Sequence, residues 1–444
     1  MSHTLPYYPI SLSTLSLVCT SLCPQVMDLL HLVLRVVGPE GVKPFVEVIV
    51  APLGNLWHSA ATTDETAPLL QKRVLNVLNV VTNALSSEDA ARLHPLALPM
   101  LVVATDLKRP EADYVLEDGL ELWASTLLQA PAYSSDLHAL FAHLAPVLTR
   151  DLEFLQVAMQ LVEAYVVMGA GTFLETHAGA VTNIFDATVA EVSDKGAPYV
   201  AAAIETVLRR FPNEGADMLR QGGILSKLLA IVMESDADDR SGNSHGGGVG
   251  GAPSMMDHTI STHYVCLLAR VALTAPEQLR ALFHTPGVSD GSPPEVLARL
   301  LQLVDVMLKR FKSVGGGSDP SGPWHRKLVA LALVSLLPAD PNVLLRLDAI
   351  LSVCLDVLSE HQAPGFVMPS LGNSDRLSEG SDHSSASDLY TTNLRAMLQG
   401  DSVQTLDLKV FLQQKMSETQ ATVGAEAFQG ALAAVDPILM QQLQ

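Results

Sequence analysis

Apolar residues return at steps of three and four along most of this chain, and this spacing limits its possible folds more than any other feature. The pattern runs through segments such as 25–37, 68–85, 135–148, 151–168 and 198–211. Spacing of this kind places the apolar side chains on one face of an α-helix. Strand-like alternation is nearly absent, so the sequence predicts an all-α protein.

Short breaks separate the helical segments, as in VGPEG (37–41), MGAGT (168–172) and RFPNEG (210–215). Pairs of segments recur at intervals of roughly 40 residues, a period typical of HEAT-type repeats. We therefore predict an α-solenoid of HEAT-type helical-hairpin repeats, which is a superhelix. A compact helical bundle is the structural alternative. It is less favoured, because single cores stop growing near ~250–300 residues, whereas a solenoid has no such limit.

Polar, Gly-rich or Ser-rich stretches interrupt the pattern and suggest an organisation for the chain. The expected parts are a poorly ordered segment 1–24, a solenoid 25–361 with flexible loops near 235–254 and 312–323, a disordered acidic and serine-rich loop 362–389, and C-terminal helices 390–444 that cap the solenoid.

The chain is strongly acidic, with 47 Asp and Glu against 27 Lys and Arg and a formal net charge of −20. This charge disfavours direct nucleic-acid binding, because phosphates would be repelled, and it suits basic protein partners. Four cysteines are too few for a disulfide framework and favour a reducing compartment. The N-terminus lacks the positive charge of a secretory signal, and we expect no membrane insertion.

Acidic residues are densest around the stretch YVLEDGLELWASTLLQAP (114–131). Its apolar residues form one helical stripe: Leu116, Leu120, Trp123 and Leu127. Four acids lie off this stripe: Asp113, Glu117, Asp118 and Glu121. A solvated helix face is the favoured interpretation, followed by an acidic patch that binds a basic partner. Catalysis by a carboxylate pair is the third, since it needs a pocket that raises one pKa. On charge alone, these four acids are the candidate cargo-binding residues.

Other motifs give no sign of chemistry. The glycines of GGGVGG (246–251) lack the strand and the Gly-Lys-Ser/Thr of a phosphate-binding loop, so a linker is favoured. The fourteen histidines form no HExxH motif, and no paired CxxC occurs. A basic cluster of Lys309, Arg310, Lys312, Arg326 and Lys327 is expected to lie at helix ends or on the surface. We predict no catalytic residue, no metal and no cofactor.

Three stretches resemble, in the same order, the importin-β (karyopherin-β) family of nuclear transport receptors. They are LEDGLELW (116–123), WHRKLVALALVSLLPADPNVL (324–344) and the C-terminal run from VQTLDLKVFLQQKM (403–416) to the last residue. With weaker similarity between them, the resemblance covers roughly residues 25–444. It implies a HEAT-repeat receptor without hydrolytic activity of its own.

The resemblance also implies partners and a location. Such receptors bind protein cargo, often basic, on an acidic surface, and touch the Phe-Gly repeats of nucleoporins. The GTPase Ran releases import cargo from them, and they shuttle between cytoplasm and nucleus through the nuclear pore. Nothing in this chain matches the N-terminal repeats that carry the main Ran-binding surface of the longer family members. The sequence thus predicts a nuclear transport receptor or its C-terminal part. The alternative is a non-transport HEAT-repeat scaffold that organises protein complexes.

Overall fold

The computed structural model describes residues 24–60, 67–109, 112–241, 255–314, 322–362 and 389–443. Within these ranges all regular structure is helical, apart from an isolated bridge between Pro286 and Ser289. The prediction of an all-α fold is confirmed.

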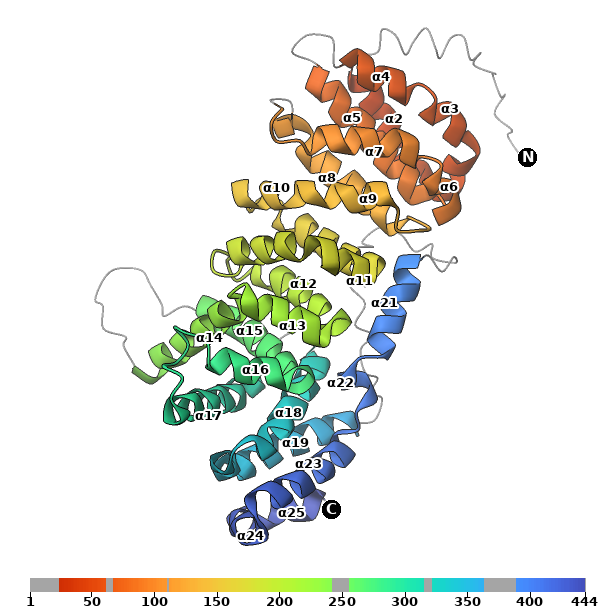
Figure 1. The fold of residues 1–444 in the computed structure, drawn as a ribbon. Coiled ribbons are helices and arrows are strands. Elements are labelled where there is room, and N and C mark those ends of the chain that lie inside the picture. Colours follow the sequence, from red (N-terminus) through yellow and green to blue (C-terminus); the bar gives the residue numbers. More distant parts are fainter. Residues whose placement is uncertain are drawn as a thin grey trace, which may run out of the picture. The chain divides into compact units, whose positions relative to one another are not determined.

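Figure 1 shows the helices in sequence order. The α-helices are α2 (Pro24–Val42), α3 (Val46–Val50), α4 (Leu53–Ala60), α5 (Ala67–Ala84), α6 (Ser87–Ala91), α7 (His94–Ala104), α8 (Ala112–Leu128), α9 (Ser135–Leu140), α10 (Leu144–Arg150), α11 (Leu155–Thr188), α12 (Ala197–Arg210), α13 (Pro212–Gln221), α14 (Ile224–Ser241), α15 (Met255–Thr274), α16 (Pro276–Phe283), α17 (Pro293–Arg310), α18 (Gly322–Leu336), α19 (Leu347–His361), α21 (Leu389–Gln399), α22 (Ser402–Thr405), α23 (Leu408–Val423), α24 (Ala425–Ala433) and α25 (Pro437–Leu443). Short 3-10 helices are η1 (Lys43–Phe45), η2 (Phe141–His143), η3 (Phe311–Ser313), η4 (Leu337–Ala339) and η5 (Pro341–Arg346).

The chain forms two compact units. Unit 1 contains Met1–Gly169 with His383–Thr392, and unit 2 contains Ala170–Asp382 with Asn393–Gln444. In unit 1, α5 packs between α2 and α8, while α4 packs on α5 and α7 packs on α8. Consecutive helix pairs thus lie side by side, as expected for HEAT-type repeats.

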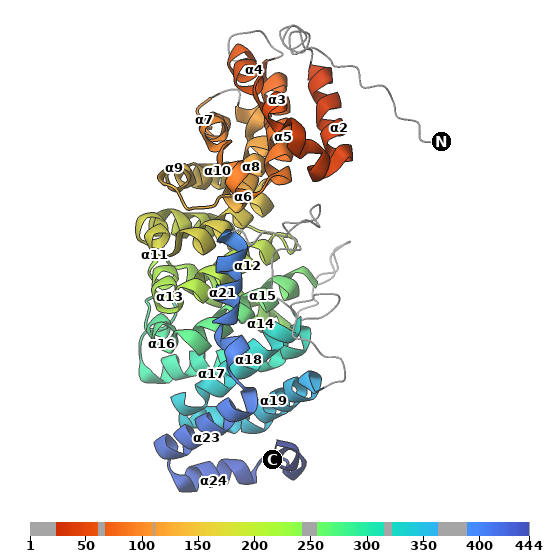
Figure 2. The ribbon, with the colours of Figure 1, turned by 90° about the vertical axis from the view of Figure 1, so that its right-hand side faces the viewer.

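Unit 2 has a similar row of packed helices. Helix α12 packs on α15, α15 packs on α18, and α18 packs on α23. In the same unit, α13 packs on α16. Figure 2 views this row from a second direction. The C-terminal helices continue the row, because α23 contacts α18 and η4 while α25 contacts α19. The boundaries expected for a terminal cap stay a prediction.

Several predicted breaks carry backbone that cannot continue a helix. Gly38 has φ 73° just before Pro39, within the break at 37–41. Ala170 has φ 47° and ψ −138°, within the break at 168–172. A serine cap begins other helices: Ser86 accepts a hydrogen bond from the Asp89 amide at the start of α6.

Two predicted segments differ in detail. Residues 135–148 form α9, η2 and the start of α10 rather than one helix. The loop expected from 235 begins later, since α14 runs to Ser241. The segments 1–24, 235–254, 312–323 and 362–389 otherwise lie mostly outside the described residues.

One helix of the described chain, α11, is long and apolar enough to cross a membrane by length and composition. However, 72% of its apolar window is buried inside the protein. Ala170 also interrupts its helical backbone. Burial of this kind is what a core helix of a helical-repeat protein shows, and length alone is weak evidence for a span.

Candidate functional site

The apolar stripe of α8 is buried in the core of unit 1, as the sequence predicts. Leu116, Leu120, Trp123 and Leu127 are all at most 4% exposed. The Trp123 indole Nε1 donates a hydrogen bond of 2.9 Å to the Tyr165 hydroxyl, which in turn donates one of 2.7 Å to the Leu137 carbonyl oxygen. These bonds tie α8 to α11 and α9 and fix the rotation of α8 about its axis.

This rotation separates the four predicted acids. Asp113, Glu117 and Glu121 are spaced four residues apart on the exposed side of α8. Asp118 points inward, and its side chain is only 8% exposed. The Arg150 guanidinium lies 2.5 Å from the Asp113 carboxylate and pairs with it.

Lys72 of α5 compensates the buried charge. Its Nζ lies 3.2 Å from Asp118 Oδ2 and 3.7 Å from Glu117 Oε2. Burial raises the pKa of Asp118, and the charge of Lys72 opposes that rise. Asp118 is therefore held in the α5–α8 packing and is not available to a partner.

Glu121 lies near two other acids of α8, Glu117 and Asp118. Partial burial of the carboxylate raises its pKa, and the charges of Asp118 and Glu117 raise it further. Basic residues of α2 and α5 lie near this face of unit 1, because the charges of Lys72 and Arg35 oppose the rise in the pKa of Glu121. The face is thus a mixture of acids and bases, with Glu117 and Glu121 as its exposed acids.

Helix α7 presents a different surface. Of its eleven residues, HPLALPMLVVA, only His94 is polar. Ala97, Met100, Leu101 and Ala104 pack inward and are buried. A short helix that is apolar all round is normally buried on every side, yet Val102 on the opposite face is 46% exposed. The outer face of α7 is therefore an uncovered apolar surface.

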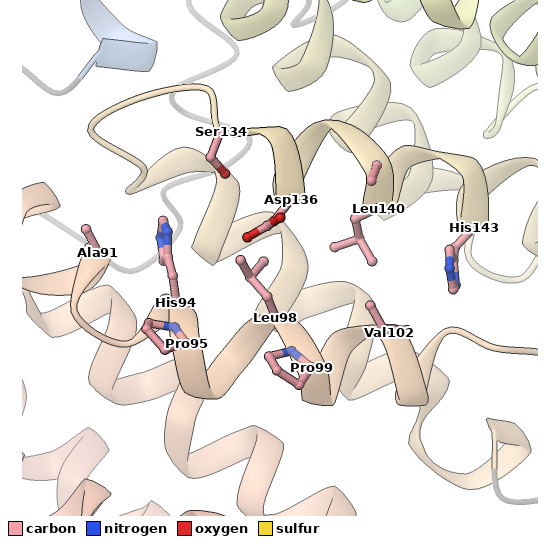
Figure 3. Close-up of a pocket in the computed structure, with 11 residues that line it drawn as sticks. Ala91, His94, Pro95, Leu98, Pro99, Val102, Ser134, Asp136, Leu140 and His143 are labelled. Atoms are coloured by element: carbon pink, nitrogen blue, oxygen red, sulfur yellow. The ribbon is translucent and has the colours of Figure 1, made fainter.

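This outer face and α9 enclose a groove of about 620 Å³ (Figure 3). Its apolar lining comes from both helices and is formed by Pro95, Leu98, Pro99, Val102, Ala139 and Leu140. Figure 3 shows Leu98 and Val102 rising from α7 towards Leu140, which points down from α9. The volume lies within the range of sites that hold small ligands or single side chains.

Polar groups stand only at the ends and rim of the groove. His94 marks one end, and burial lowers its pKa, so its imidazole is neutral at pH 7. His143 marks the other end, where its Nδ1 lies 3.0 Å from the Thr105 hydroxyl oxygen. Ser134 caps α9 by accepting a hydrogen bond from the Leu137 amide, and Asp136 lies on the same rim.

A second groove in unit 1 lies between η1–α3 and α6, with a volume of about 660 Å³. Its apolar residues include Pro44, Val50 and Leu93, but charged side chains cross it. Arg92 Nη2 lies 3.8 Å from Glu47 Oε1. The α7–α9 groove is the more apolar of the two and is our candidate site.

The described residues of the two grooves show no arrangement typical of a catalytic or metal site. Within the described residues no cluster of His, Cys, Asp and Glu could hold a metal ion. The α7–α9 groove offers no carboxylate pair and no nucleophile paired with a base. Its geometry suits the non-covalent binding of apolar or aromatic side chains.

The basic residues that lie close together in the sequence form ion pairs with different helices. Arg326 Nη2 lies 2.5 Å from Glu360 Oε2, which joins α18 to α19. Lys309 Nζ lies 2.9 Å from Asp236 Oδ1, which joins α17 to α14. Lys327 is buried, with only 8% of its surface exposed. The structure brings no basic patch together from these residues.

Sequence analysis missed the α7–α9 groove. The signal was present in the sequence, because only one of the eleven residues of α7 is polar. A short helix in a two-layer repeat leaves one face uncovered, so part of this apolar surface had to be exposed. The partner face on α9 could not be inferred, because it depends on how α9 is placed against α7.

The fold matches that of a known transport receptor. Lph2 of S. cerevisiae, described as a bidirectional nuclear transport receptor, superposes with a TM-score of 0.70. The superposition covers 98% of this chain and 43% of Lph2, at 17% sequence identity. The two chains therefore share a fold.

A family described as importin-11-like, with TPR repeats, matches residues 72–444. Importin-11 of Mus musculus is 24% identical over 433 residues, and Importin-11 of Homo sapiens is 25% identical over 433 residues. Both alignments cover 95% of this chain and 41% of the relative. The importin beta-like protein kap113 of Schizosaccharomyces pombe is 23% identical over 425 residues.

The chain is thus a helical-repeat protein of the importin-β class, as the resemblance predicted. Within that class it belongs to the importin-11-like family. It spans about two fifths of the length of the curated relatives it matches. These relatives are importins or importin beta-like proteins by name.

Proposed function

We propose that this chain acts in nuclear transport as a receptor, or as the C-terminal part of one, that binds nucleoporins and protein cargo. The observation that carries the proposal is the uncovered apolar groove between α7 and α9 in a member of the importin-11-like family. An exposed apolar groove without catalytic groups suits repeated, weak contacts with apolar side chains.

The proposed ligand of the groove is the phenyl ring of a Phe-Gly repeat. Leu98 and Val102 of α7 and Leu140 of α9 offer the ring apolar contacts from both sides of the groove. The neutral His94 at one end adds a flat edge without charge. A phenyl ring is worth about 1.5–3 kcal/mol when fully buried, which gives the weak binding that rapid passage through a pore needs.

The proposed cargo surface is the exposed face of α8. Glu117 and Glu121 lie one helical turn apart and are exposed, so they can contact Lys or Arg side chains of a basic cargo. Asp113 is half-exposed but paired with Arg150. Asp118 supports this face from within through Lys72 rather than touching cargo.

A binding assay with Phe-Gly repeat peptides tests the nucleoporin proposal. Val102→Asp places a charge in the apolar lining of the groove, and we expect it to weaken peptide binding about tenfold or more. Leu345→Asp is the matched control, because Leu345 is 77% exposed and lies outside the groove. Equal binding by wild type and the Val102→Asp variant would rule out the groove as the site.

A second assay tests cargo binding and Ran control. Glu117→Gln with Glu121→Gln should weaken binding of a basic nuclear cargo, and Glu88→Gln, an exposed acid on α6, should not. Ran-GTP is added to the wild-type complex to test cargo release. Stable complexes that ignore Ran-GTP and Phe-Gly peptides would instead favour a non-transport scaffold.

A further inference from the structure

Unit 2 contains a buried cluster of four charged side chains that no part of the proposed transport function uses. Helix α12 contributes Glu205 and Arg209, α15 contributes Arg270, and the turn before α22 contributes Asp401. Arg270 is 1% exposed and Asp401 is 0% exposed at the side chain. Charges this deeply buried persist only when each one is compensated.

Glu205 holds the two arginines in place. Its Oε1 accepts hydrogen bonds from Arg209 Nη2 at 2.8 Å and from Arg270 Nη2 at 2.9 Å. Its Oε2 lies 3.1 Å from His325 Nε2 of α18. Burial alone would raise the pKa of Glu205, but the charges of Arg209 and Arg270 outweigh it and hold that pKa well below its usual range.

One carboxylate cannot neutralise two guanidinium groups. Asp401 supplies the second charge: Arg270 Nη1 donates to its Oδ1 at 3.2 Å, and Arg209 Nε lies 3.0 Å from its Oδ2. Arg209 also lies over the Trp324 ring, 5.4 Å from the ring centroid. We call Arg209 and Arg270, with Trp324 beside them, the arginine site.

Asp401 fits the arginine site imperfectly. Its Oδ1 is shared, because it also accepts a hydrogen bond of 2.8 Å from the Val403 amide as the cap of α22. Its Oδ2, although buried, accepts no well-directed hydrogen bond from any described residue. A carboxylate that is free of the capping role could align both oxygens with the two guanidinium groups.

A second acid of the same segment follows six positions later. Asp407 caps α23 by accepting a hydrogen bond from the Val410 amide. Burial lowers the pKa of Lys327 on α18, and the charges of Asp407 and Asp401 oppose that shift. The ion pairs with the arginines of α12 and α15 are made by Asp401, and the charge of Asp407 acts on Lys327 of α18 in addition.

Few other contacts hold the middle of this segment. The four-residue helix α22 buries Val403, whereas Gln404 and Thr405 are exposed. Figure 1 shows α22 as a short element near α18, with which it is in contact, ahead of the longer α23 that packs on α18 and η4. The ion pairs of Asp401 and the burial of Val403 attach this segment to the rest of unit 2.

We propose that the arginine site is a carboxylate-binding site which the chain fills with its own Asp401, and that an acidic peptide segment of a partner protein displaces residues 401–407 to bind there. Replacing one carboxylate by another keeps the buried arginines compensated, so the exchange avoids the large cost of an unpaired buried charge. The proposal concerns unit 2 and does not depend on the groove in unit 1.

The probe is a labelled synthetic peptide with the chain's own sequence 398–408, LQGDSVQTLDL. The Asp401→Asn variant keeps a side chain that can cap α22 but loses the charge in the arginine site. Measured by fluorescence anisotropy, this variant should bind the peptide about tenfold or more tightly than wild type. A peptide with Asn in place of its first Asp should not bind to either chain.

Asp340→Asn is the matched control, since Asp340 caps η5 in the same way but makes no ion pair with an arginine among the described residues. It should bind the peptide no better than wild type. Equal binding by the Asp401→Asn and Asp340→Asn variants would overturn the proposal, as would equal binding of the Asn-substituted peptide.

Hydrogen exchange on the wild-type chain decides the matter if the Asp401→Asn variant does not fold. Excess acidic peptide should speed amide exchange at residues 401–406 and leave α15 and α18 unchanged. Unchanged exchange at 401–406 over the whole titration would contradict displacement.

Discussion

The Trp123 indole nitrogen and the Tyr165 hydroxyl oxygen lie 2.9 Å apart, and their rings meet edge to face with centroids 6.0 Å apart. Both side chains are fully buried. This pair joins α8, which carries the proposed cargo acids, to α11. Because the Tyr165 hydroxyl also donates to the Leu137 carbonyl, it indirectly sets the position of α9 and of the α7–α9 groove.

Replacing Tyr165 by Phe removes both hydrogen bonds while keeping the ring. The indole N–H of Trp123 and the carbonyl of Leu137 are then left without this partner, and we expect unfolding to become easier by about 1–3 kcal/mol. Urea denaturation followed by tryptophan fluorescence measures this. Tyr199→Phe is the control, since Tyr199 is only half-buried. No loss of stability in Tyr165→Phe would show that the hydrogen bonds do not hold α9.

Replacing Gly119 by Ala tests the close packing of α8 on α7. A Cβ at this position would lie 2.9 Å from the Ala104 Cβ, so one of the two helices must shift. We expect a loss of about 1–3 kcal/mol in the free energy of unfolding, the usual range for overpacking. Gly179→Ala is the control, because its Cβ would meet no atom within 4 Å. A neutral Gly119→Ala would show that these helices pack less closely.

Replacing Ala170 by Gly should stabilise the chain. Ala170 has φ 47° and ψ −138°, a conformation that costs a residue with a Cβ of order 1–3 kcal/mol and costs glycine little. We expect a rise in melting temperature. The control Ala180→Gly, at a helical position, should lower stability by about 0.5–1 kcal/mol. A fall in melting temperature for both variants would mean that α11 is helical through residue 170.

The depressed pKa of Glu205 makes stability depend on pH. A carboxyl whose folded pKa lies below its unfolded value stabilises the fold above the unfolded pKa, near 4.5, and this contribution is lost as pH falls through the folded pKa. Glu205→Gln leaves the two buried arginines under-compensated, so we expect a loss of about 3–5 kcal/mol at neutral pH.

The acid arm of this experiment compares the free energy of unfolding of both chains between neutral pH and pH 3. As pH falls, the free energy of unfolding should decrease more steeply in wild type than in Glu205→Gln. The reason is that only in wild type can this carboxyl take up a proton when the chain unfolds. Glu214→Gln, at an exposed acid on α13, should follow the wild-type curve. Parallel curves for all three chains would show that Arg209 and Arg270 do not hold Glu205 in its charged form.

Local sequence pattern sufficed to predict the helices and their repeat arrangement. The apolar stripe of α8, from Leu116 to Leu127, is buried as its spacing implies. The break near Ala170 was also visible from Gly169 and Gly171. Both features depend on residues close together in the chain, where helical periodicity and glycine act directly.

The candidate sites depended on contacts between distant residues, which no local pattern reveals. Asp118 shares a five-residue stretch with Glu117 and Glu121, yet only the packing of α5 shows that it is buried against Lys72. Arg270 and Asp401 are 131 residues apart in sequence. Both the capping of α22 by Asp401 and its ion pairs with the arginines became visible only in the fold.

Mapping where a Phe-Gly repeat peptide binds tests the proposed role of the α7–α9 groove most directly. Methyl-labelled chain, observed by NMR, is titrated with the peptide. We expect shifts to concentrate at the methyl groups of Leu98, Val102 and Leu140, and Val102→Asp to abolish them. Shifts confined to other surfaces, or none at peptide concentrations that saturate a known receptor, would contradict this role.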